Sequence, residues 1–567
     1  MKISFPVRMI FLYITIFLVA FLLIGRLYFL QIMNGEAFSD QADRQYIAPN
    51  DTIFNRGSIF FKDKNENLIS AATLKTGFIL AMVPKLLEDP EDAYKKISNI
   101  IEIDADIFYN KANKKDDPYE EILNKLDIET ANKIEELNIS GIKIYKERWR
   151  FYPGGNLFAH TLGFMGYSGD SFEGLYGVEK YYNDLLKRDD SRMYMNFFAE
   201  TFSDISKSLS GKKLEGDIVL TIEPTAQSFL ETELKNISEK YNTDSAVGVV
   251  IDPKDGGIYA LGINPSFDLN NFENEKNSSF RNPFVEDVYE MGSIIKPITM
   301  AIGLDTGVVD AETTYNDTGS MTINGSKISN YDGKARGVVN IQEVLNQSLN
   351  IGATFIEQKI GNKKFAEYML DLGIGEETGI DLPNETSGLV SNLKSNRDIE
   401  YATASFGQGI AMTPVETVKA LCTLVNGGKL ITPHITSGIK HRIGISRELM
   451  YDEGERIFKK ETSEEISRML VRVVDEALIG GSVKLDNYSI GAKTGTAQIA
   501  KEDGRGYYDD KYLHSFFGFF PAYNPKFLIF FYIVNPKGEA YASHTLTEPF
   551  MNTVDFLINY YEVPPDR

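Results

Sequence analysis

The sequence predicts a multidomain α+β protein with a transmembrane helix at its N-terminus. A chain of 567 residues is too long for one hydrophobic core, so two or three domains are expected. Residues 9–25 carry no charged side chain. Further along the chain, segments with helical periodicity alternate with short runs rich in β-branched and aromatic residues, which are typical of strands.

The apolar segment MIFLYITIFLVAFLLIG, residues 9–25, predicts a membrane anchor. Its 17 residues are the short end for a bilayer-spanning helix, and apolar neighbours lengthen it. Lys2 and Arg8 precede it, which favours a cytoplasmic N-terminus and an extracytoplasmic body. A cleaved signal peptide is the alternative, but no small-x-small cleavage pattern follows the apolar run. Residues 1–34 are therefore expected to form a cytoplasmic stub and the anchor.

Residues 35–215 are expected to form a second, mixed α/β domain. GFILAMV and GIKIYKERWRFY are typical of strands, whereas PYEEILNKLDIETANKIEEL has apolar residues at helical spacing and predicts a surface helix. A polar, glycine-bearing stretch between Lys207 and Glu215 marks the boundary. Residues 216–567 then form the largest domain.

The largest domain is expected to combine helices with paired strands. Its predicted helices are residues 225–241, 464–478 and 547–561. SAVGVVIDP and GGIYALGI predict a strand pair across the turn at Pro253 to Gly256. NYSIGAKTGTAQ predicts another strand, and FLIFFYIV follows it across FGFFPAYNPK, which is consistent with two adjacent antiparallel strands.

Composition excludes several classes of function. The formal net charge of −21 argues against a nucleic-acid partner, since phosphate binding needs a basic surface. The single cysteine, Cys422, excludes internal disulfides, and its apolar helical surroundings predict a packed, inert thiol. The five histidines show no ligand spacing, so we expect neither a metal nor another cofactor.

The stretch YEMGSIIKP holds the candidate nucleophile, Ser293, with Lys296 three residues later. A serine hydroxyl needs a nearby base at neutral pH, and positions three apart share a helical face. Gly292 lets this helix start lie close to a substrate. The spacing alone is not specific. The same pattern recurs, without further motif residues, at Ser391/Lys394 and Ser437/Lys440.

Two further motifs follow Ser293 in a fixed order. The first is Ser348-Leu349-Asn350, between two segments of helical periodicity, and the second is Lys493-Thr494-Gly495-Thr496. Another Lys-Thr-Gly begins at Lys75, but it precedes the serine and lacks the following threonine. The ordered set of three motifs is far more specific than any one of them.

Each motif has a chemical reason. Lys296 can act as a base only when neutral, and both burial and the second cation at Lys493 would lower its pKa. Ser348 can relay a proton, and the Asn350 amide can donate to and accept from a substrate peptide bond. The strand around Lys493 can hold an extended peptide along its edge.

The third motif is expected to bind the substrate's terminal carboxylate. The Lys493 ammonium and the hydroxyls of Thr494 and Thr496 suit such a group. Gly495 would leave room for the substrate at the strand edge. Backbone N–H groups of Ser293 and Thr496 would form an oxyanion hole.

Nearly the whole chain resembles the class B penicillin-binding proteins, the monofunctional peptidoglycan D,D-transpeptidases. Beyond the three motifs, the resemblance lies in Arg56-Gly57, ERWRFYPGGNLFAHTLGFMG, GLYGVEKYYNDLL, GDIVLTIEPTAQ, VIDPKDGGIYAL, SFGQGIAMTP and SFFGFFPA. It implies a membrane-anchored pedestal (dimerisation) domain and a penicillin-recognising transpeptidase domain. The latter has an antiparallel sheet flanked by helices, as in serine β-lactamases.

The resemblance also implies an activity. Ser293 would attack the D-Ala-D-Ala end of a stem peptide with Lys296 as base, assisted by Ser348, Asn350 and Lys493. An amine of a second stem peptide would then resolve the acyl-enzyme. β-Lactams would acylate the same serine. The implied partners are a membrane-embedded glycosyltransferase and other cell-wall synthesis proteins at the bacterial cytoplasmic membrane, and we expect a septal rather than a lateral-wall role.

Other functions remain open at this stage. A D,D-carboxypeptidase or β-lactamase would use the same serine but pass the acyl group to water. A β-lactam sensor would need further membrane spans, and no other stretch has the necessary length. A non-catalytic scaffold would tolerate loss of Ser293 or Lys493, both of which are present.

Overall fold

The computed structural model describes residues 54–169, 171–188, 215–441, 446–452, 454–501 and 506–567, together with Leu18 and Phe21. The predicted anchor at 9–25 lies outside the described residues, apart from those two positions. Among the helices that the structure describes, none combines the length and the apolar character needed to cross a bilayer.

The largest domain is built on a five-stranded antiparallel sheet in the order β16–β17–β18–β8–β9. Its strands are β8 (Ser245–Ile251), β9 (Ile258–Asn264), β16 (Gly491–Ala500), β17 (Tyr507–Phe520) and β18 (Phe527–Val534). Phe516 and Phe517, adjacent in β17, belong to two different hydrophobic cores, one on each face of the sheet. The predicted α+β class is therefore confirmed for the described residues.

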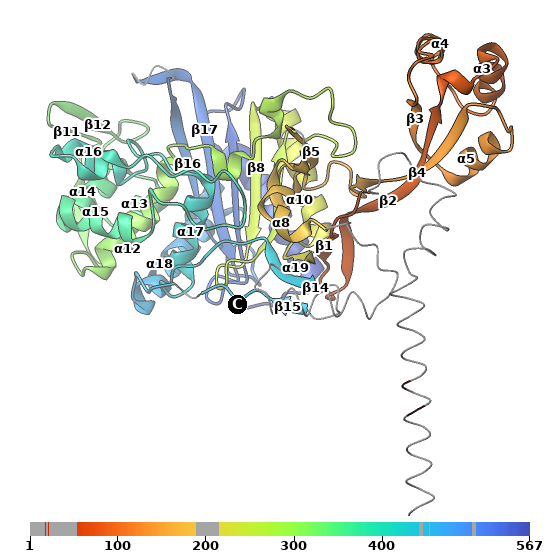
Figure 1. Ribbon diagram of the computed structural model, residues 1–567. Helices are drawn as coiled ribbons and strands as arrows, with labels where there is room; N and C mark the ends of the chain where they lie inside the picture. Colours follow the sequence, from red (N-terminus) through yellow and green to blue (C-terminus); the bar gives the residue numbers. More distant parts are fainter. Residues whose placement is uncertain are drawn as a thin grey trace, which may run out of the picture.

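Helices cover both faces of this sheet (Figure 1). On one face lie α10 (Pro224–Tyr241) and α19 (Ala542–Tyr561). The other face carries the helical subdomain: η4 (Gly292–Ile295), α12 (Lys296–Asp305), α13 (Gln342–Asn346), α14 (Asn350–Ile360), α15 (Asn362–Asp371), α16 (Asp398–Ala404), α17 (Pro414–Val425) and α18 (Lys460–Arg472). Cys422 lies on α17 and is fully buried, as expected.

Shorter elements complete this domain. They are η3 (Asn277–Phe280), α11 (Pro283–Glu286), β10 (Thr314–Asp317), β11 (Ser320–Ile323), β12 (Ser326–Ser329), β13 (Gly337–Asn340), η5 (Ser391–Lys394), the π-helix η6 (Val473–Ala477) and η7 (Leu478–Gly481). β10 pairs with β13 and β11 with β12, so residues 314–340 form a small arm beside the helices.

The prediction that the Lys-Thr-Gly strand and FLIFFYIV are adjacent strands was wrong. FLIFFYIV forms β18, but β17 lies between it and β16, so β16 and β18 are not adjacent. The first half of β17, YYDDKYL, is polar and half-exposed, and its second half ends in FGFFP, which has turn residues. This segment lacks a regular alternation of apolar and polar residues. It forms a strand because it pairs with β16 on one edge and β18 on the other.

A second sheet crosses the expected domain boundary. It runs β15–β14–β7–β1–β2–β3, with β4 also paired to β2, so strands from before residue 215 and after residue 216 share one sheet. Its strands are β1 (Ile59–Lys62), β2 (Leu68–Met82), β3 (Glu120–Leu126), β4 (Ile142–Phe151), β7 (Gly216–Leu220), β14 (Thr436–His441) and β15 (Ser446–Glu448).

The far ends of β2 and β4 carry a separate lobe with its own core (Figure 1). It contains η2 (Pro84–Leu86), α3 (Pro90–Ser98), α4 (Ala105–Ala112) and α5 (Ile128–Glu135). The single helix predicted for PYEEILNKLDIETANKIEEL was wrong, because its first half is β3. Asp127 explains the switch: its side chain accepts from Thr130 N–H and caps α5, while the preceding residues pair with β2.

Three of the family-like segments meet in one buried ion cluster. Arg56 precedes β1, Arg150 lies on β4, and Glu179 lies on α7 (Gly177–Tyr181). Glu179 accepts from Arg56 Nε at 2.7 Å and from Arg150 Nε at 2.5 Å. Burial opposes the charge of Glu179, yet the two guanidinium groups outweigh it and lower its pKa. The remaining short elements here are α6 (Ala159–Leu162), β5 (Met165–Ser168), β6 (Ser171–Gly174) and α8 (Asn183–Leu186).

Replacing Glu179 by alanine is expected to destabilise the protein by about 3–5 kcal/mol, because two buried guanidinium groups lose their counter-ion. The free energy of unfolding, from urea denaturation, measures the effect. The matched control is Glu129→Ala, which breaks the exposed Glu129–Lys133 pair and should leave stability as it is. Equal stability of the two variants would contradict a structural role for the cluster.

Candidate active site

One cavity collects residues from all three motifs. It has a volume of about 740 Å³ and lies where η4, the α13–α14 turn and β16 meet. The predicted site residues that line it are Ser293, Ser348, Asn350, Lys493, Thr494 and Thr496. Lys296 is buried beside it and reaches Ser348. Gly495 does not line the cavity, although its neighbours Thr494 and Thr496 on β16 do.

Ser293 lies on the short helix η4, directly before Lys296 begins α12. Gly292 has φ +64°, a conformation that glycine adopts without strain, and a Cβ there would meet the Thr496 carbonyl oxygen at 3.1 Å. The Gly292 N–H donates to the Gly407 carbonyl at 3.0 Å. The glycine thus lets the serine-bearing turn lie directly against β16.

Ser348 occupies an unusual backbone conformation between α13 and α14. Its φ is +55°, which is uncommon for a residue with a side chain and is often found at functional sites. The turn breaks the helical pattern that both flanking segments show. This places the Ser348 hydroxyl and carbonyl side by side, facing Lys296.

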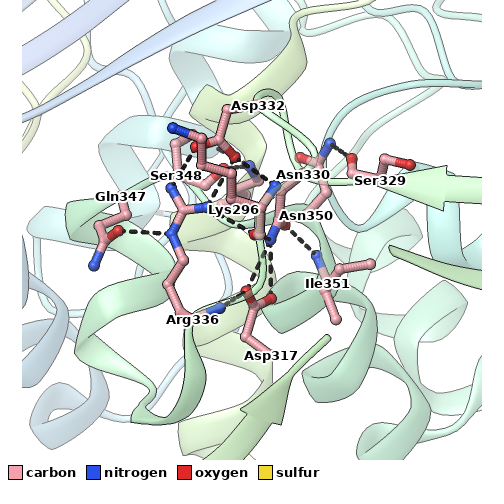
Figure 2. A network of polar contacts seen from close by, with 11 residues as sticks. Lys296, Asp317, Ser329, Asn330, Asp332, Arg336, Gln347, Ser348, Asn350 and Ile351 are labelled. Carbon is pink, nitrogen blue, oxygen red and sulfur yellow. Dashed lines mark hydrogen bonds and ion pairs between the residues drawn. The ribbon is translucent and has the colours of Figure 1, made fainter. Parts of the chain in front are cut away.

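Both lysines converge on Ser348. Lys296 Nζ donates to the Ser348 carbonyl at 2.6 Å and to its Oγ at 3.2 Å. Lys493 Nζ donates to the same Oγ at 3.2 Å and to the Thr494 carbonyl at 3.0 Å. Figure 2 shows Lys296 and Ser348 close together within a larger polar network. The three motifs therefore form one continuous hydrogen-bonded chain.

The environment favours neutral amines. Lys296 and Lys493 are only 1% and 3% exposed. Burial, and then the charge of Lys493, hold the pKa of Lys296 well below its usual range. Burial lowers the pKa of Lys493 to about 7. These are the two causes that the sequence indicated for Lys296.

The Ser293 hydroxyl makes no hydrogen bond to Lys296 among the described residues; it is half-exposed at the wall of the cavity. A neutral lysine has two N–H donors and one lone pair. Both N–H donors of Lys296 would be used by acceptors on Ser348. The lone pair on Lys296 Nζ would then be free to accept the hydroxyl proton of Ser293. Catalytic hydrogen bonds of this kind often tighten only once substrate is bound.

Asn350 begins α14, and a polar network that the sequence did not reveal holds it. Its amide donates to the Ser329 carbonyl at 2.9 Å, and Asn330 Oδ1 accepts from the Ile351 N–H at 3.2 Å. The Asn330 amide in turn donates to both carboxylate oxygens of Asp317 at 3.0 Å (Figure 2). The segment Asn-Tyr-Asp-Gly at 330–333 has the composition of a solvated turn, so no sequence signal singled it out.

Arg336 joins the same arm to the residue that precedes Ser348. Arg336 makes a bidentate contact with Asp332 at 2.8 and 2.9 Å (Figure 2). Its Nε donates to the side-chain oxygen Oε1 of Gln347 at 3.0 Å. Gln347 immediately precedes Ser348. The arm 314–340 therefore braces the second motif on both sides of the serine.

Glu290 is a further site neighbour that sequence reasoning missed. It accepts from the Gly409 N–H at 2.9 Å, and the Tyr507 hydroxyl donates to it at 3.0 Å. Glu290 thereby joins the serine-bearing segment, the loop that carries Gln408 into the cavity wall, and the β16–β17 hairpin. Burial raises the pKa of this carboxyl. The one sequence signal that could have identified Glu290 was its position three residues before Ser293.

The third motif lies on β16, an edge strand of the central sheet, beside the cavity. Thr494 and Thr496 line the cavity, and Thr496 Oγ1 accepts from the Ala542 N–H at 3.1 Å. The structure gives a different reason for Gly495 than room for substrate. A Cβ there would meet Ser515 Oγ at 2.4 Å and the Met291 carbonyl at 2.8 Å, so the glycine lets the serine-bearing turn pack on the strand.

Gly495→Ala is therefore expected to lower the rate of serine acylation about 10²-fold, because the new Cβ pushes Met291 and the adjoining serine turn off β16. Acylation by a fluorescent β-lactam measures the rate. The double variant Gly495→Ala/Ser515→Ala removes the hydroxyl contact alone, so it should recover little. Wild-type acylation in the single variant would contradict this role.

The repeated patterns elsewhere do not gather such groups. Ser391 and Lys394 lie exposed on η5. Ser437 and Lys440 lie on β14, where the Ser437 hydroxyl donates to the Val219 carbonyl at 3.1 Å. Lys75 lies on β2. Within the described residues, no group of three or more His, Cys, Asp or Glu side chains is arranged to hold a metal ion.

Two protein-family models match this chain. A family model described as the penicillin binding protein transpeptidase domain matches residues 246–554, and one described as the penicillin-binding protein dimerisation domain matches residues 54–200. Stage V sporulation protein D of Bacillus subtilis is 30% identical, covering 97% of this chain and 85% of that protein.

Two further similarities extend the comparison. A probable peptidoglycan D,D-transpeptidase PenA of Neisseria meningitidis is 28% identical over 96% of this chain and 91% of its own length. The crystal structure of penicillin binding protein 2X from Streptococcus thermophilus has a TM-score of 0.73 at 19% identity, covering 90% of this chain and 81% of that chain. The last similarity is one of fold.

Proposed function

Because this chain belongs to the penicillin-binding protein transpeptidases, we propose that it cross-links peptidoglycan stem peptides through an ester on Ser293. The observation that carries the proposal is the hydrogen-bonded chain from Lys296 through Ser348 to Lys493 in the cavity that Ser293 lines. It supplies a buried amine of lowered pKa as a base for the serine of the same cavity, which acyl transfer requires.

In the first half-reaction, Lys296 Nζ takes the Ser293 hydroxyl proton while Oγ attacks the carbonyl carbon of the penultimate D-alanine. Backbone N–H groups of Ser293 and Thr496 stabilise the resulting oxyanion. The C–N bond then breaks, and the proton passes through Ser348 to the leaving nitrogen. D-Alanine departs, and the remaining stem peptide is an ester on Ser293.

In the second half-reaction, the amine of another stem peptide attacks the ester carbon. A new amide bond forms, the bond to Ser293 Oγ breaks, and the amine proton returns to that oxygen by way of Ser348 and Lys296. Asn350 orients the peptide bond of the acyl chain, and Lys493, Thr494 and Thr496 hold the terminal carboxylate before it leaves. β-Lactams enter at the first step and remain as stable esters.

The cellular setting belongs to the same proposal. The apolar segment 9–25 would anchor the chain in the bacterial cytoplasmic membrane with its catalytic domain outside. There it would act with a membrane-embedded glycosyltransferase, which supplies the glycan strands. The pedestal (residues 35–215) would hold the transpeptidase domain (residues 216–567), and with it the cavity, away from the bilayer. We place the activity at a septum rather than along the lateral wall.

Product analysis tests the proposal against a serine hydrolase. The purified protein receives a soluble stem pentapeptide ending in D-Ala-D-Ala and an amine acceptor, and mass spectrometry separates cross-linked from hydrolysed product. A transpeptidase forms the cross-linked amide in proportion to acceptor concentration. Hydrolysed tetrapeptide as the sole product, at every acceptor concentration, would assign the protein to the D,D-carboxypeptidases instead.

A further inference from the structure

Glu290 lies outside the cavity, yet it is hydrogen-bonded to two of the segments that form its walls. The side chain is half-buried and does not line the cavity itself. One carboxylate oxygen accepts from the Gly409 N–H at 2.9 Å. The Tyr507 hydroxyl donates to both carboxylate oxygens, at 3.1 and 3.0 Å. The proposed acyl transfer gives this carboxylate no chemical step, so its contacts need another explanation.

The first of these walls is the loop 406–409. Gly407 and Gly409 have φ +78° and +76°, and Gln408 between them lines the cavity. One side of the loop is fixed by the Asn392 amide, which donates to the Gly409 carbonyl at 2.6 Å. The N–H of the same glycine is held by Glu290. The carboxylate therefore helps to set where Gln408 stands.

The second wall is a two-stranded arm. Strand β18 pairs with residues 513–520 of β17, so the preceding residues 507–512 have β16 as their sole strand partner among the described strands. Gln498 of β16 and its register partner Tyr512 line the cavity from this arm. A ribbon of two strands is only marginally stable by itself. The bond from Tyr507 to the carboxylate ties its far end to the serine-bearing segment.

The serine-bearing segment has anchors of its own besides Glu290. The Met291 carbonyl accepts from the Ser515 hydroxyl at 2.9 Å. The Gly292 N–H donates to the Gly407 carbonyl at 3.0 Å. Loss of the Glu290 carboxylate should therefore displace the two walls more than it displaces the nucleophile.

The direction of the bound substrate shows which of its parts meets these walls. In the proposed reaction the terminal carboxylate lies at Lys493. Ser293 lies beside Thr496, because the glycine before the serine packs on the Thr496 carbonyl. The stem residues before the two D-alanines therefore continue along β16 from Thr496 towards Gln498, antiparallel to the strand. At that end of the cavity Gln408 stands on the other wall.

We propose that Glu290 is a positioning residue for the donor stem peptide: through Gly409 and Tyr507 it sets the spacing of the two walls between which the residues upstream of D-Ala-D-Ala bind. This inference rests on the proposed transpeptidase function and deepens it. Burial, and then the charge of Glu290, raise the pKa of Tyr507, so the hydroxyl keeps the proton that it donates. Gln408 and Gln498 then offer their amides to the backbone of the stem.

Two thioester donors that differ only upstream of the scissile bond test the proposal. One is N-acetyl-D-alanyl thioglycolate. The other is the thioglycolate ester of the stem tetrapeptide, made with lysine and with diaminopimelate at its third position, and the better of these two is used. Both donors release thioglycolate when the Ser293 ester forms. A thiol reagent follows this release by the full-length protein, whose single cysteine, Cys422, is fully buried.

The readout is the ratio of kcat/KM for the long donor to kcat/KM for the short donor. This ratio cancels any general loss of active enzyme, so a merely structural effect of a variant leaves it unchanged. The wild type should prefer the long donor. In Glu290→Ala the ratio should fall about tenfold, because the hydrogen bonds to both walls are lost. In Tyr507→Phe, which frees one wall, it should fall about threefold or more.

Two further variants serve as controls. Glu290→Gln keeps an oxygen that accepts from the Gly409 N–H and an amide that can donate to the Tyr507 hydroxyl, so its ratio should stay within about twofold of the wild type. Tyr508→Phe removes the hydroxyl of the next residue on β17 and should leave the ratio as it is. Among the described residues, the tyrosine hydroxyl bonded to Glu290 is that of Tyr507.

The outcomes separate this inference from the proposed function. A wild-type ratio near one, or an unchanged ratio in either Glu290→Ala or Tyr507→Phe, overturns the positioning role while leaving acyl transfer at Ser293 standing. Release of thioglycolate from neither donor by the wild type overturns the proposed acyl transfer itself. A wild-type preference that both variants weaken and Glu290→Gln retains supports the inference.

Discussion

Ser293→Ala is expected to abolish covalent labelling by a fluorescent β-lactam, with a loss of at least about 10⁴-fold in acylation rate. The Ser293 hydroxyl is the one proposed nucleophile in a cavity where Lys296, Ser348 and Lys493 are already linked. Without its oxygen no ester can form. Gel fluorescence after incubation with the probe measures the adduct directly.

The chain offers a matched control for this variant. Ser391 stands three residues before Lys394 on η5, in the same local spacing, but both side chains are exposed. Ser391→Ala should label like the wild type. Labelling of Ser293→Ala at the wild-type level would place the nucleophile elsewhere and remove the basis of the proposed mechanism.

Lys296→Met is expected to slow acylation by about 10²–10⁴-fold without lowering the free energy of unfolding near neutral pH. The amine is buried beside the Lys493 ammonium, so in the folded protein its pKa lies well below the usual value. The unfolded chain binds that proton more readily, which favours unfolding. An apolar side chain of similar length avoids this cost.

The sign of the pH dependence follows from the same shift. The pKa of Lys296 is lowered on folding, so its contribution to stability rises with pH until the unfolded lysine also loses its proton, near pH ~10.4. The stability advantage of Lys296→Met should therefore shrink as pH rises towards that value. The wild-type acylation rate should instead increase through the lowered pKa and then level off, since the neutral amine is the base.

Measured acylation rates and urea unfolding across the pH range check both statements. Lys394→Met, at the exposed repeat of the motif, is the control and should change neither quantity. Lys296→Met with normal acylation would transfer the role of base to another group. A stability difference that grows with pH would contradict the burial of a neutral amine.

Local sequence signals predicted a large part of the fold. The strand pair β8–β9 and helix α10 have clear periodicity and turn residues, and both are present. The local sequence pattern was insufficient for segments whose structure is set by pairing with neighbouring strands. β17 is polar over its first half, and β3 has a helix-like spacing that pairing with β2 overrides.

The candidate site shows the same division. The order of the three motifs, which resembles that of the penicillin-binding proteins, pointed to Ser293, Lys296, Ser348, Asn350 and the third motif. Their residue types suit acyl transfer, which needs a nucleophile, a base and carboxylate ligands. Nothing in the order of residues could reveal Asp317, Asn330 and Arg336, which act through contacts with the second motif. Gly495 was placed correctly on its strand, but its packing partner Met291 is distant in sequence.

The amino-acid sequence by itself determined which reactive groups the protein owns and which segments have an intrinsic preference for helix or strand, since both properties belong to single residues and their near neighbours. The tertiary structure alone decided that two lysines meet on one serine, and that Ile479 adopts a left-handed conformation at the wall of the cavity. Those properties depend on contacts between segments far apart in the chain, and no local pattern encodes them.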